Sequence, residues 1–157
     1  MAIKPILFNT EMVRAILDGR KTCTRRAVKH NVEAVLNSPY HMEHPEVEDA
    51  WLIKKLCRPP YEPGDILYVR ETWGEGYAEG TYIYKADDKL AERLQDMTDD
   101  DAEAEGCFDY TSTALGFPDV WDSTIKKSDR DRYGWEANPW VWVIEFERCE
   151  KPEEVRS

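Results

Sequence analysis

The sequence lacks the features that mark several common functional classes. Its four cysteines are scattered without a Cys-x-x-Cys pair, so neither a zinc knuckle nor a dithiol redox motif is present. No apolar run approaches the roughly 20 residues of a membrane span, and the N-terminus is too short and interrupted for a signal peptide. His41 and His44 lie among glutamates that are typical of a solvated loop. We therefore expect a cytoplasmic protein with no membrane partner, no metal and no cofactor.

A net basic charge is also missing, because the formal charge is -11. Binding a long polyanion normally requires a net basic surface. The charge is unevenly distributed, however: residues 1–70 carry +2 and residues 71–157 carry -13. This distribution argues against sequence-independent wrapping of long nucleic acid, but it is compatible with a small basic pocket for one nucleotide.

The composition favours one folded domain over residues 1–157, with 41% hydrophobic residues and six tryptophans. The patterns predict an α+β fold with a PUA-like, partly open β-barrel of about five to six strands and flanking helices. Insertions are expected near residues 31–60 and 98–135. Strands are predicted near 5–8, 20–28, 66–73, 80–85 and 140–148, helices near 11–19, 32–36 and 87–97, and surface loops near 98–106 and 126–132.

The densest polar segment is residues 19–26, Gly-Arg-Lys-Thr-Cys-Thr-Arg-Arg, which follows the first predicted helix and enters a strand. Burial and like charge would favour the neutral amine of Lys21, a base that activates a hydroxyl, and Thr24 offers that hydroxyl three residues on. Arg26 can hold a phosphate or an oxyanion. The alternative is a solvated basic strand that protects a sheet edge.

The pattern Gly19-x-Lys21-x-x-Thr24-x-Arg26 resembles the signature of ASCH-domain proteins, Gly-x-Lys-x-x-Glu-or-Thr-x-Arg. The surrounding order of elements, including the turn at residues 63–65 and the strand at 140–146, is also similar to that family. The whole chain resembles longer ASCH-like proteins of phages and prophages, which implies a bacterial host cell. The resemblance implies a PUA-like barrel whose cleft binds RNA or a nucleotide.

One enzymatic branch of this family removes the acetyl group from N4-acetylcytidine with a lysine, a threonine and a downstream glutamate. By position, Lys21 and Thr24 correspond to the first two of these residues. Glu71 is the nearest candidate for the glutamate, although in that branch the glutamate follows the barrel strand by a longer interval. The resemblance therefore implies Lys21, Thr24 and Glu71 as candidate catalytic residues of an amidohydrolase.

Five further residues are expected to contact RNA or a nucleotide. They are the cations around the motif and on the strand that begins near residue 66, with one tryptophan that can stack on a base: Arg20, Arg25, Arg26, Arg70 and Trp73. Trp140 and Trp142 are assigned to packing, because they alternate with valines in an apolar strand.

Two other functions remain open from the sequence. In the first, the acidic C-terminal half mimics nucleic acid and binds a protein partner, as a phage-type inhibitor of a host enzyme would. In the second, the chain is a ribonuclease, which would need a general base that no histidine obviously supplies near the motif.

Overall fold

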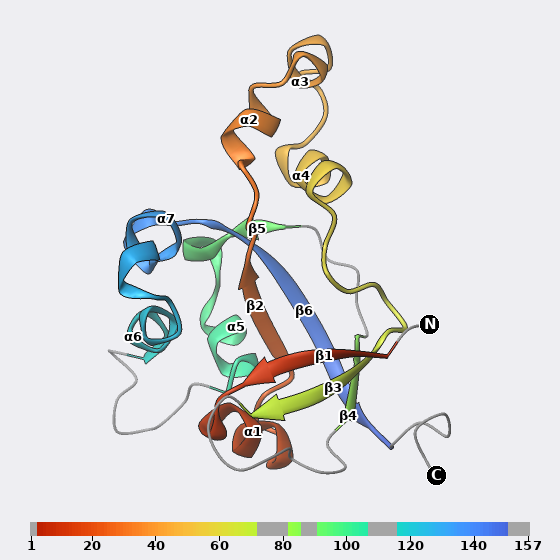
Figure 1. The fold of residues 1–157 in the computed structure, drawn as a ribbon, viewed down its shortest axis with the longest axis vertical. Coiled ribbons are helices and arrows are strands. Elements are labelled where there is room, and N and C mark those ends of the chain that lie inside the picture. The colour runs from red at the N-terminus through yellow and green to blue at the C-terminus, as the bar shows by residue number, and fades with distance from the viewer. Residues whose placement is uncertain (1–2, 72–81, 86–90, 107–115, 151–157) are drawn as a thin grey trace.

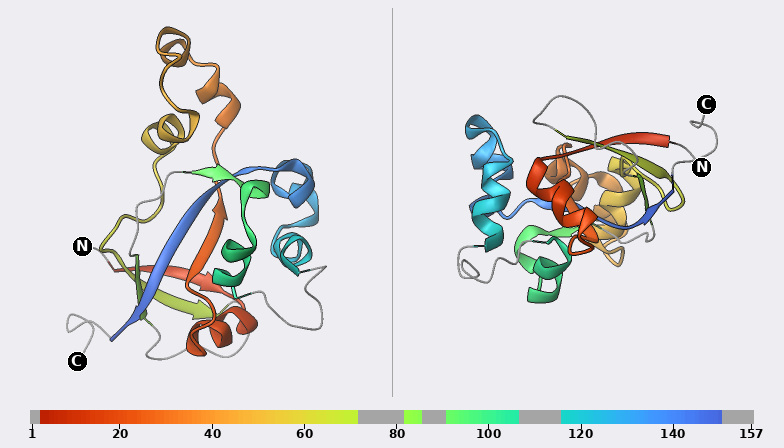
Figure 2. Two further views of the ribbon diagram at one scale, coloured as in Figure 1. Left: turned by 180° about the vertical axis from the view of Figure 1, so that it is seen from behind. Right: turned by 90° about the horizontal axis from the view of Figure 1, so that it is seen from below.

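The computed structural model describes residues 3–71, 82–85, 91–106 and 116–150. Six strands form one strongly curved sheet (Figures 1 and 2). They are β1 (Ile3–Phe8), β2 (Cys23–Ala27), β3 (Ile66–Glu71), β4 (Tyr82–Lys85), β5 (Glu92–Arg93) and β6 (Trp140–Cys149). Seven α-helices are seen in the described ranges: α1 (Thr10–Leu17), α2 (Val32–Leu36), α3 (Pro39–Glu43), α4 (Asp49–Cys57), α5 (Asp99–Ala104), α6 (Gly116–Ser123) and α7 (Arg130–Tyr133).

The sheet has the order β1-β3-β4-β6-β2, with β5 added to β6. Among the described strands, β1 and β3 pair in parallel and every other pairing is antiparallel. Among the described strands, no pairing joins β1 to β2, so the barrel stays open between them. This arrangement confirms the prediction of an α+β fold with a partly open barrel of five to six strands.

Strand β6 joins β2 to β4 because it is long enough to pair with both strands. Its first half pairs with β2, from Val141 to Glu145, and its last residues pair with β4. Its side chains are almost continuously buried from Val141 to Ile144, which explains the apolar start of the segment in the sequence. The central position predicted for this strand is confirmed.

Helix α1 begins and ends where its capping residues require. The side chain of Asn9 accepts a hydrogen bond from the backbone N–H of Met12, which satisfies one of the free donors of the first turn. Gly19, with a φ of 78°, takes the left-handed conformation just after the helix. The chain then turns directly into the segment that contains Lys21.

The core consists of two clusters on the two sides of the β2–β6 region. The larger one packs β1, β3, β4 and β6 against α1 and α4, with Phe8, Leu67 and Ile83 almost fully buried. The smaller one packs β2 and β6 against α6, through Phe117 and Trp121. Helices α2, α3 and α4 extend beyond the sheet as an arm, shown at the top of Figure 1.

Three local predictions are wrong. The segment predicted as a helix near 87–97 forms β5 and a 3-10 turn (Leu94–Asp96) where it is described, because Leu94 is drawn into the core. The segment 98–106 is the helix α5 and not a loop, because Thr98 and Asp101 form a capping box. The predicted loop near 126–132 contains a 3-10 turn (Lys127–Asp129) and the start of α7, followed by another 3-10 turn (Trp135–Ala137).

No helix within the described ranges is both long and apolar enough to cross a bilayer. The longest α-helix described is α4, at 9 residues.

Gly106 and Gly19 form a matched pair for testing how tightly α5 packs on the motif. Both have positive φ, 76° and 78°, yet a Cβ on Gly106 would lie 2.9 Å from Cβ of Lys21 and 3.0 Å from Cβ of Ala15. A Cβ on Gly19 would meet nothing within 4 Å. We expect Gly106→Ala to lower the free energy of unfolding by about 1–3 kcal/mol more than Gly19→Ala, because only the former adds overpacking to the backbone strain. Urea denaturation measures both, and equal losses would contradict this packing.

Candidate nucleotide-binding site

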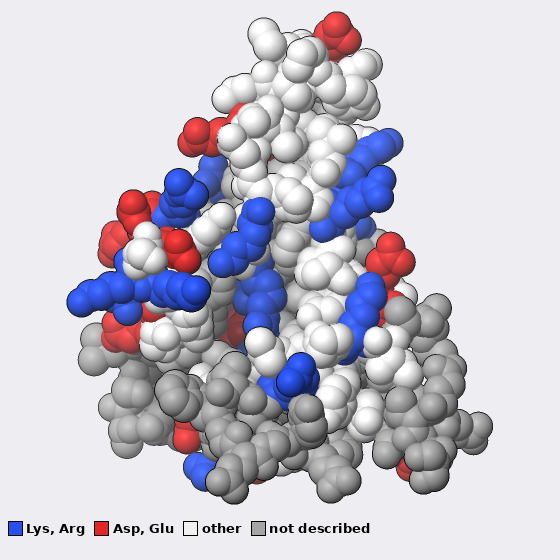
Figure 3. Space-filling model, in the orientation of Figure 1, with Lys and Arg blue, Asp and Glu red and all other residues white. Residues whose placement is uncertain are grey.

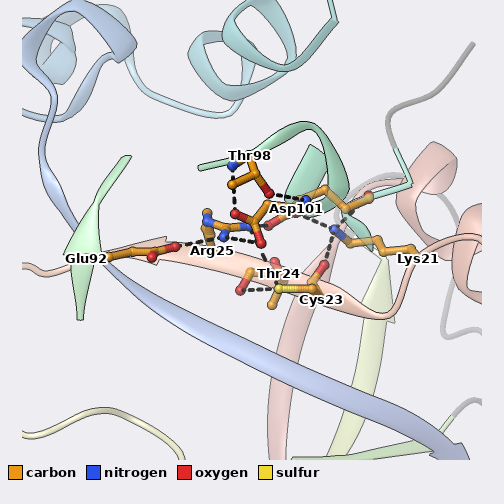
Figure 4. Close-up of polar contacts among 8 residues, drawn as sticks. Lys21, Cys23, Thr24, Arg25, Glu92, Thr98 and Asp101 are labelled. Atoms are coloured by element: carbon orange, nitrogen blue, oxygen red, sulfur yellow. Dashed lines mark hydrogen bonds and ion pairs between the residues drawn. The ribbon is translucent and has the colours of Figure 1, made fainter. Parts of the chain in front are cut away.

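The lysine of the motif, Lys21, is buried and surrounded by hydrogen-bond acceptors. The ammonium nitrogen of Lys21 donates to the Glu105 carboxylate at 2.8 Å, to the Glu105 carbonyl at 3.1 Å and to the Cys23 carbonyl at 2.8 Å (Figure 4). The side chains of Lys21 and Glu105 are only 1% and 4% exposed. Three oxygen acceptors match the three donors of an ammonium group, so these contacts hold the Lys21 side chain in one position.

Arg25 continues the same ion-pair cluster. Its guanidinium contacts the carboxylates of Glu105 at 3.1 Å, Glu92 at 2.8 Å and Asp101 at 3.4 Å. Burial lowers the pKa of Arg25, but the hydrogen bond with Glu92 and the neighbouring charges outweigh burial, so the net pKa is raised. Arg25 is therefore a permanent cation whose charge is matched inside the protein.

The position of Glu105 depends on the close contact of α5 with the motif. Lys21 and Glu105 form a single antiparallel bridge, and the backbone N–H of Thr22 donates to the Ala104 carbonyl at 2.7 Å. Gly106 has no side chain, so the backbone can pass close to Lys21 without a steric clash. The end of α5 is thus attached to the start of β2, and it places one carboxylate between two cations.

The thiol next to this cluster is unsuited to nucleophilic chemistry. Burial, together with the Glu105 charge, raises the pKa of Cys23 to about 12. Cys23 therefore stays a protonated thiol at neutral pH and contributes to packing.

A cavity of about 720 Å³ opens beside β2. Its apolar and aromatic wall is formed by β1, α1, β6 and α6, with Phe8, Met12, Phe117, Val120, Trp121, Ile125 and Trp142. Its polar lining comes from the motif, from the segment after β2 and from the turn after α4, and includes Asn9, Thr24, Arg26, Lys29, His30, Arg58, Tyr61 and Glu105. A hollow of this size, with apolar walls and a few polar groups, is typical of a small-molecule site.

Arg26 is placed very differently from Arg25, although the two are neighbours in the chain. Its guanidinium lies 4.9 Å from the ring centroid of Phe8 and donates to the Leu7 carbonyl at 2.7 Å. Its buried Nε has no acceptor, and no carboxylate forms an ion pair with it, among the residues that the structure describes. Burial lowers the pKa of Arg26. A half-buried cation that forms no ion pair with a described carboxylate attracts an anionic ligand.

Thr24 also faces the cavity and is 97% buried, with 3% of its surface exposed. Within the described part of the chain, no residue makes a hydrogen bond with its hydroxyl, although its carbonyl lies 3.9 Å from the Cys23 sulfur. The hydroxyl is therefore available to a ligand in the cavity. Glu105 lines the same cavity as Thr24, and its carboxylate accepts a hydrogen bond from Lys21.

The other predicted residues lie in several places. Arg20 is exposed and contacts Asp18 and the Gly106 carbonyl, at 3.3 Å each. Arg70 is exposed on β3, opposite Leu7 of β1. The backbone of Glu71 pairs with Phe8 at the end of β3, but its side chain lies outside what the structure describes, as does the whole of Trp73.

Sequence reasoning missed Glu105, the aromatic wall of α6 and Arg58. Glu105 was hidden in an acidic run that looks solvated, although Thr98 and Asp101 have the spacing of a capping box and so indicated a helix there. Nothing local in the sequence indicated that α6 or Arg58 would face the motif, since only the tertiary fold brings them there. No cluster of metal-ligating side chains occurs in the described ranges.

The buried cluster predicts a strong effect of removing the Glu105 charge. Glu105→Gln leaves the buried Lys21 without its carboxylate and removes one of the three carboxylates around Arg25, so we expect a loss of about 3–5 kcal/mol in the free energy of unfolding. Glu92→Gln is the control, because that side chain is 34% exposed, and we expect it to lose about 1 kcal/mol or less. Chemical denaturation at neutral pH compares the two, and a Glu105→Gln loss as small as that of the control would show that the cluster is not a determinant of stability.

One solved structure with the same fold is an ASCH domain from Lactobacillus crispatus JV V101, with a TM-score of 0.55 and 11% sequence identity, over 96% of this chain and 81% of that chain. Two weaker structural matches are the hypothetical protein PH0355, with a TM-score of 0.47, and protein EF3133 of Enterococcus faecalis V583, a DUF984 protein, with a TM-score of 0.46. Both are 12% identical, and they cover 95% and 96% of this chain and 100% and 77% of their own chains. The sequence matches no protein-family model and no curated protein. The chain has the fold of an ASCH domain.

Proposed function

We propose that this chain binds a nucleotide, free or within RNA, in the cavity beside β2. The observation that carries the proposal is Arg26, a half-buried arginine that lines the cavity, with a buried Nε that has no acceptor and with no carboxylate partner among the described residues. A phosphate or a base carbonyl would supply the missing acceptor. The volume of about 720 Å³ suits a ligand of nucleotide size.

The aromatic residues in the cavity wall favour binding of the nucleobase. Trp121, Trp142 and Phe8 offer flat aromatic surfaces, and such rings bind bases by stacking without regard to sequence. Lys29 and Arg58 add positive charge to the lining, which favours a phosphate. An aromatic wall opposite a group of cations therefore matches the two halves of a nucleotide.

The test is fluorescence anisotropy with short labelled single-stranded RNA and with the four nucleoside monophosphates. Arg26→Ala removes one charge-assisted hydrogen bond to the ligand at a half-buried position, and we expect at least a tenfold loss of affinity. Arg20→Ala is the control, because it removes an exposed arginine of the same motif whose contacts are to Asp18 and Gly106. Unchanged binding by Arg26→Ala would overturn the proposal.

Lys21→Ala is a poor test of binding, because it leaves Glu105 without one of its two buried cations. A loss of binding in that variant would report unfolding as readily as a missing contact. If no RNA or nucleotide binds to the intact protein, the alternative of a protein partner for the acidic half is tested by charge reversal at Glu103, Asp119 and Asp122.

A second candidate function is hydrolysis of N4-acetylcytidine. The observation that favours it is that Thr24 and Glu105 line one cavity while Glu105 holds Lys21 at 2.8 Å, which brings a lysine, a threonine and a glutamate together. Glu105 follows β3 by the longer interval that the ASCH resemblance implies, so we assign it the role expected for Glu71. In the reaction, water adds to the acetyl carbonyl, the amide C–N bond breaks, and acetate and cytidine are released.

The hydrolysis candidate predicts that the Thr24 hydroxyl is essential for turnover and not for binding. We expect Thr24→Val, which keeps the shape of the side chain, to reduce the rate of cytidine formation at least 100-fold, as measured by chromatography. Thr22→Val is the matched control, since Thr22 is exposed two residues earlier. If the intact protein binds the nucleotide but releases no cytidine, the hydrolysis candidate is wrong and the protein only binds its ligand.

A further inference from the structure

A second hollow lies on the helical arm and shares one lining residue, Arg58, with the cavity described above. It has a volume of about 580 Å³ and is formed by α4 and the turn after it, with Trp51, Lys54, Lys55, Arg58 and Glu62 among its lining residues. We call it the arm groove. Three cations and one carboxylate give its lining a positive charge in a protein whose net charge is -11.

Arg58 lines both the arm groove and the cavity beside β2, so the two hollows meet at this residue. It directly follows α4 with a φ of 52°, and Asn138 is the other described non-glycine residue with a positive φ. An arginine rarely adopts this backbone conformation, which glycine would adopt without strain. The strained turn places an exposed cation at the boundary of two hollows, and backbone strain of this kind clusters at ligand-binding sites.

Trp51 gives the arm groove an aromatic surface. Its side chain lies on α4 and is 38% exposed, although a tryptophan of a small domain is usually buried in the core. The ammonium group of Lys55 lies 4.7 Å from the centroid of its ring. An exposed ring next to cations is the combination that holds an unpaired base and its phosphate in proteins that bind single strands.

The charged surface agrees with this arrangement. Figure 3 shows Lys and Arg side chains distributed over one face, from the region of β2 to the side of the arm, with few Asp and Glu between them. Arg26 and Lys29 line the cavity, Lys54 and Lys55 line the arm groove, and Arg58 lines both. A flexible strand that crosses this face would meet cations along its backbone and an aromatic surface in each hollow.

We propose that the arm groove binds the nucleotide next to the one in the cavity, with Arg58 on the phosphate that joins them. The ligand is therefore single-stranded RNA of at least two nucleotides. Single strands are required because the bases of a duplex are stacked and paired, and so are unavailable to Trp51. This inference rests on the proposed function, since the cavity must hold the first nucleotide.

The test measures affinity as a function of length with fluorescein-labelled oligouridylate and oligocytidylate of one, two and four nucleotides. For the intact protein we expect affinity to rise at least tenfold between one and two nucleotides. Trp51→Ala is expected to abolish most of this rise while the affinity for one nucleotide stays within twofold. The same lengths of DNA show whether the 2′-hydroxyl contributes, and equal binding of DNA would broaden the ligand to any single strand and contradict a site selective for RNA.

Arg58→Gly is the second variant, because glycine accepts the positive φ and removes only the side chain. We expect it to weaken binding of two nucleotides at least fivefold and to reduce the slope of log affinity against log salt by about one. Leu56→Ala is the matched control, since Leu56 is 51% exposed on the same helix and is not part of the groove lining. Circular dichroism checks that each variant is folded.

The outcomes separate this inference from the proposed function. If Arg26→Ala abolishes binding at every length while Trp51→Ala and Arg58→Gly keep the full gain with length, the cavity binds a nucleotide and the arm groove does not. If the intact protein fails to bind one nucleotide or longer RNA, both proposals are wrong.

Discussion

The carboxylate of Glu105, buried between Lys21 and Arg25, is the contact on which the geometry of the site depends. A charge in that position is stable only while both cations surround it, and the cations in turn need the carboxylate. Because Glu105 lies at the end of α5 and Lys21 precedes β2, their pairing fixes a helix from the middle of the chain against the motif. The same contact sets the wall of the cavity and the direction in which β2 enters the sheet. Lys21 and Arg25 are therefore used inside this cluster, whereas Arg26 forms no ion pair with any described carboxylate.

The balance of charge within the molecule differs from what the net charge suggests. Three acidic side chains of residues 92–105 neutralise Arg25, and one of them also neutralises Lys21, so part of the acidic half is used inside the protein. Around the cavity, cations outnumber carboxylates. Its lining includes Arg26, Lys29 and Arg58, whereas the carboxylate in the lining is that of Glu105, which is already paired. A protein with a charge of -11 can thus present a locally positive face, and screening over about 8–10 Å limits the repulsion from its acidic surfaces.

The sequence was informative wherever a local pattern decides the structure. The cap at Asn9, the helix after it, and the strands β2, β3 and β6 follow from periodicity and turn residues, and the resemblance to ASCH domains indicated the open barrel. The failures are all tertiary. A run of acids between Thr98 and Gly106 reads as solvated unless its capping spacing is recognised, and even then nothing local shows that Glu105 turns inward. Neighbouring arginines such as Arg25 and Arg26 are equivalent in the sequence, and they differ only because a strand sends alternate side chains to opposite faces.

The position of β6 has a consequence for how the molecule forms. This strand pairs with β2 and with β4, so the sheet is continuous only when it is in place. Its partner β2 lies more than a hundred residues earlier in the chain, which gives these contacts a large sequence separation and a high entropic barrier to formation. During synthesis on the ribosome, β2 therefore has no main pairing partner until β6 has been made. The edge of β2 is exposed to other chains throughout that interval, and the basic side chains that follow Gly19 give it a charge that opposes aggregation.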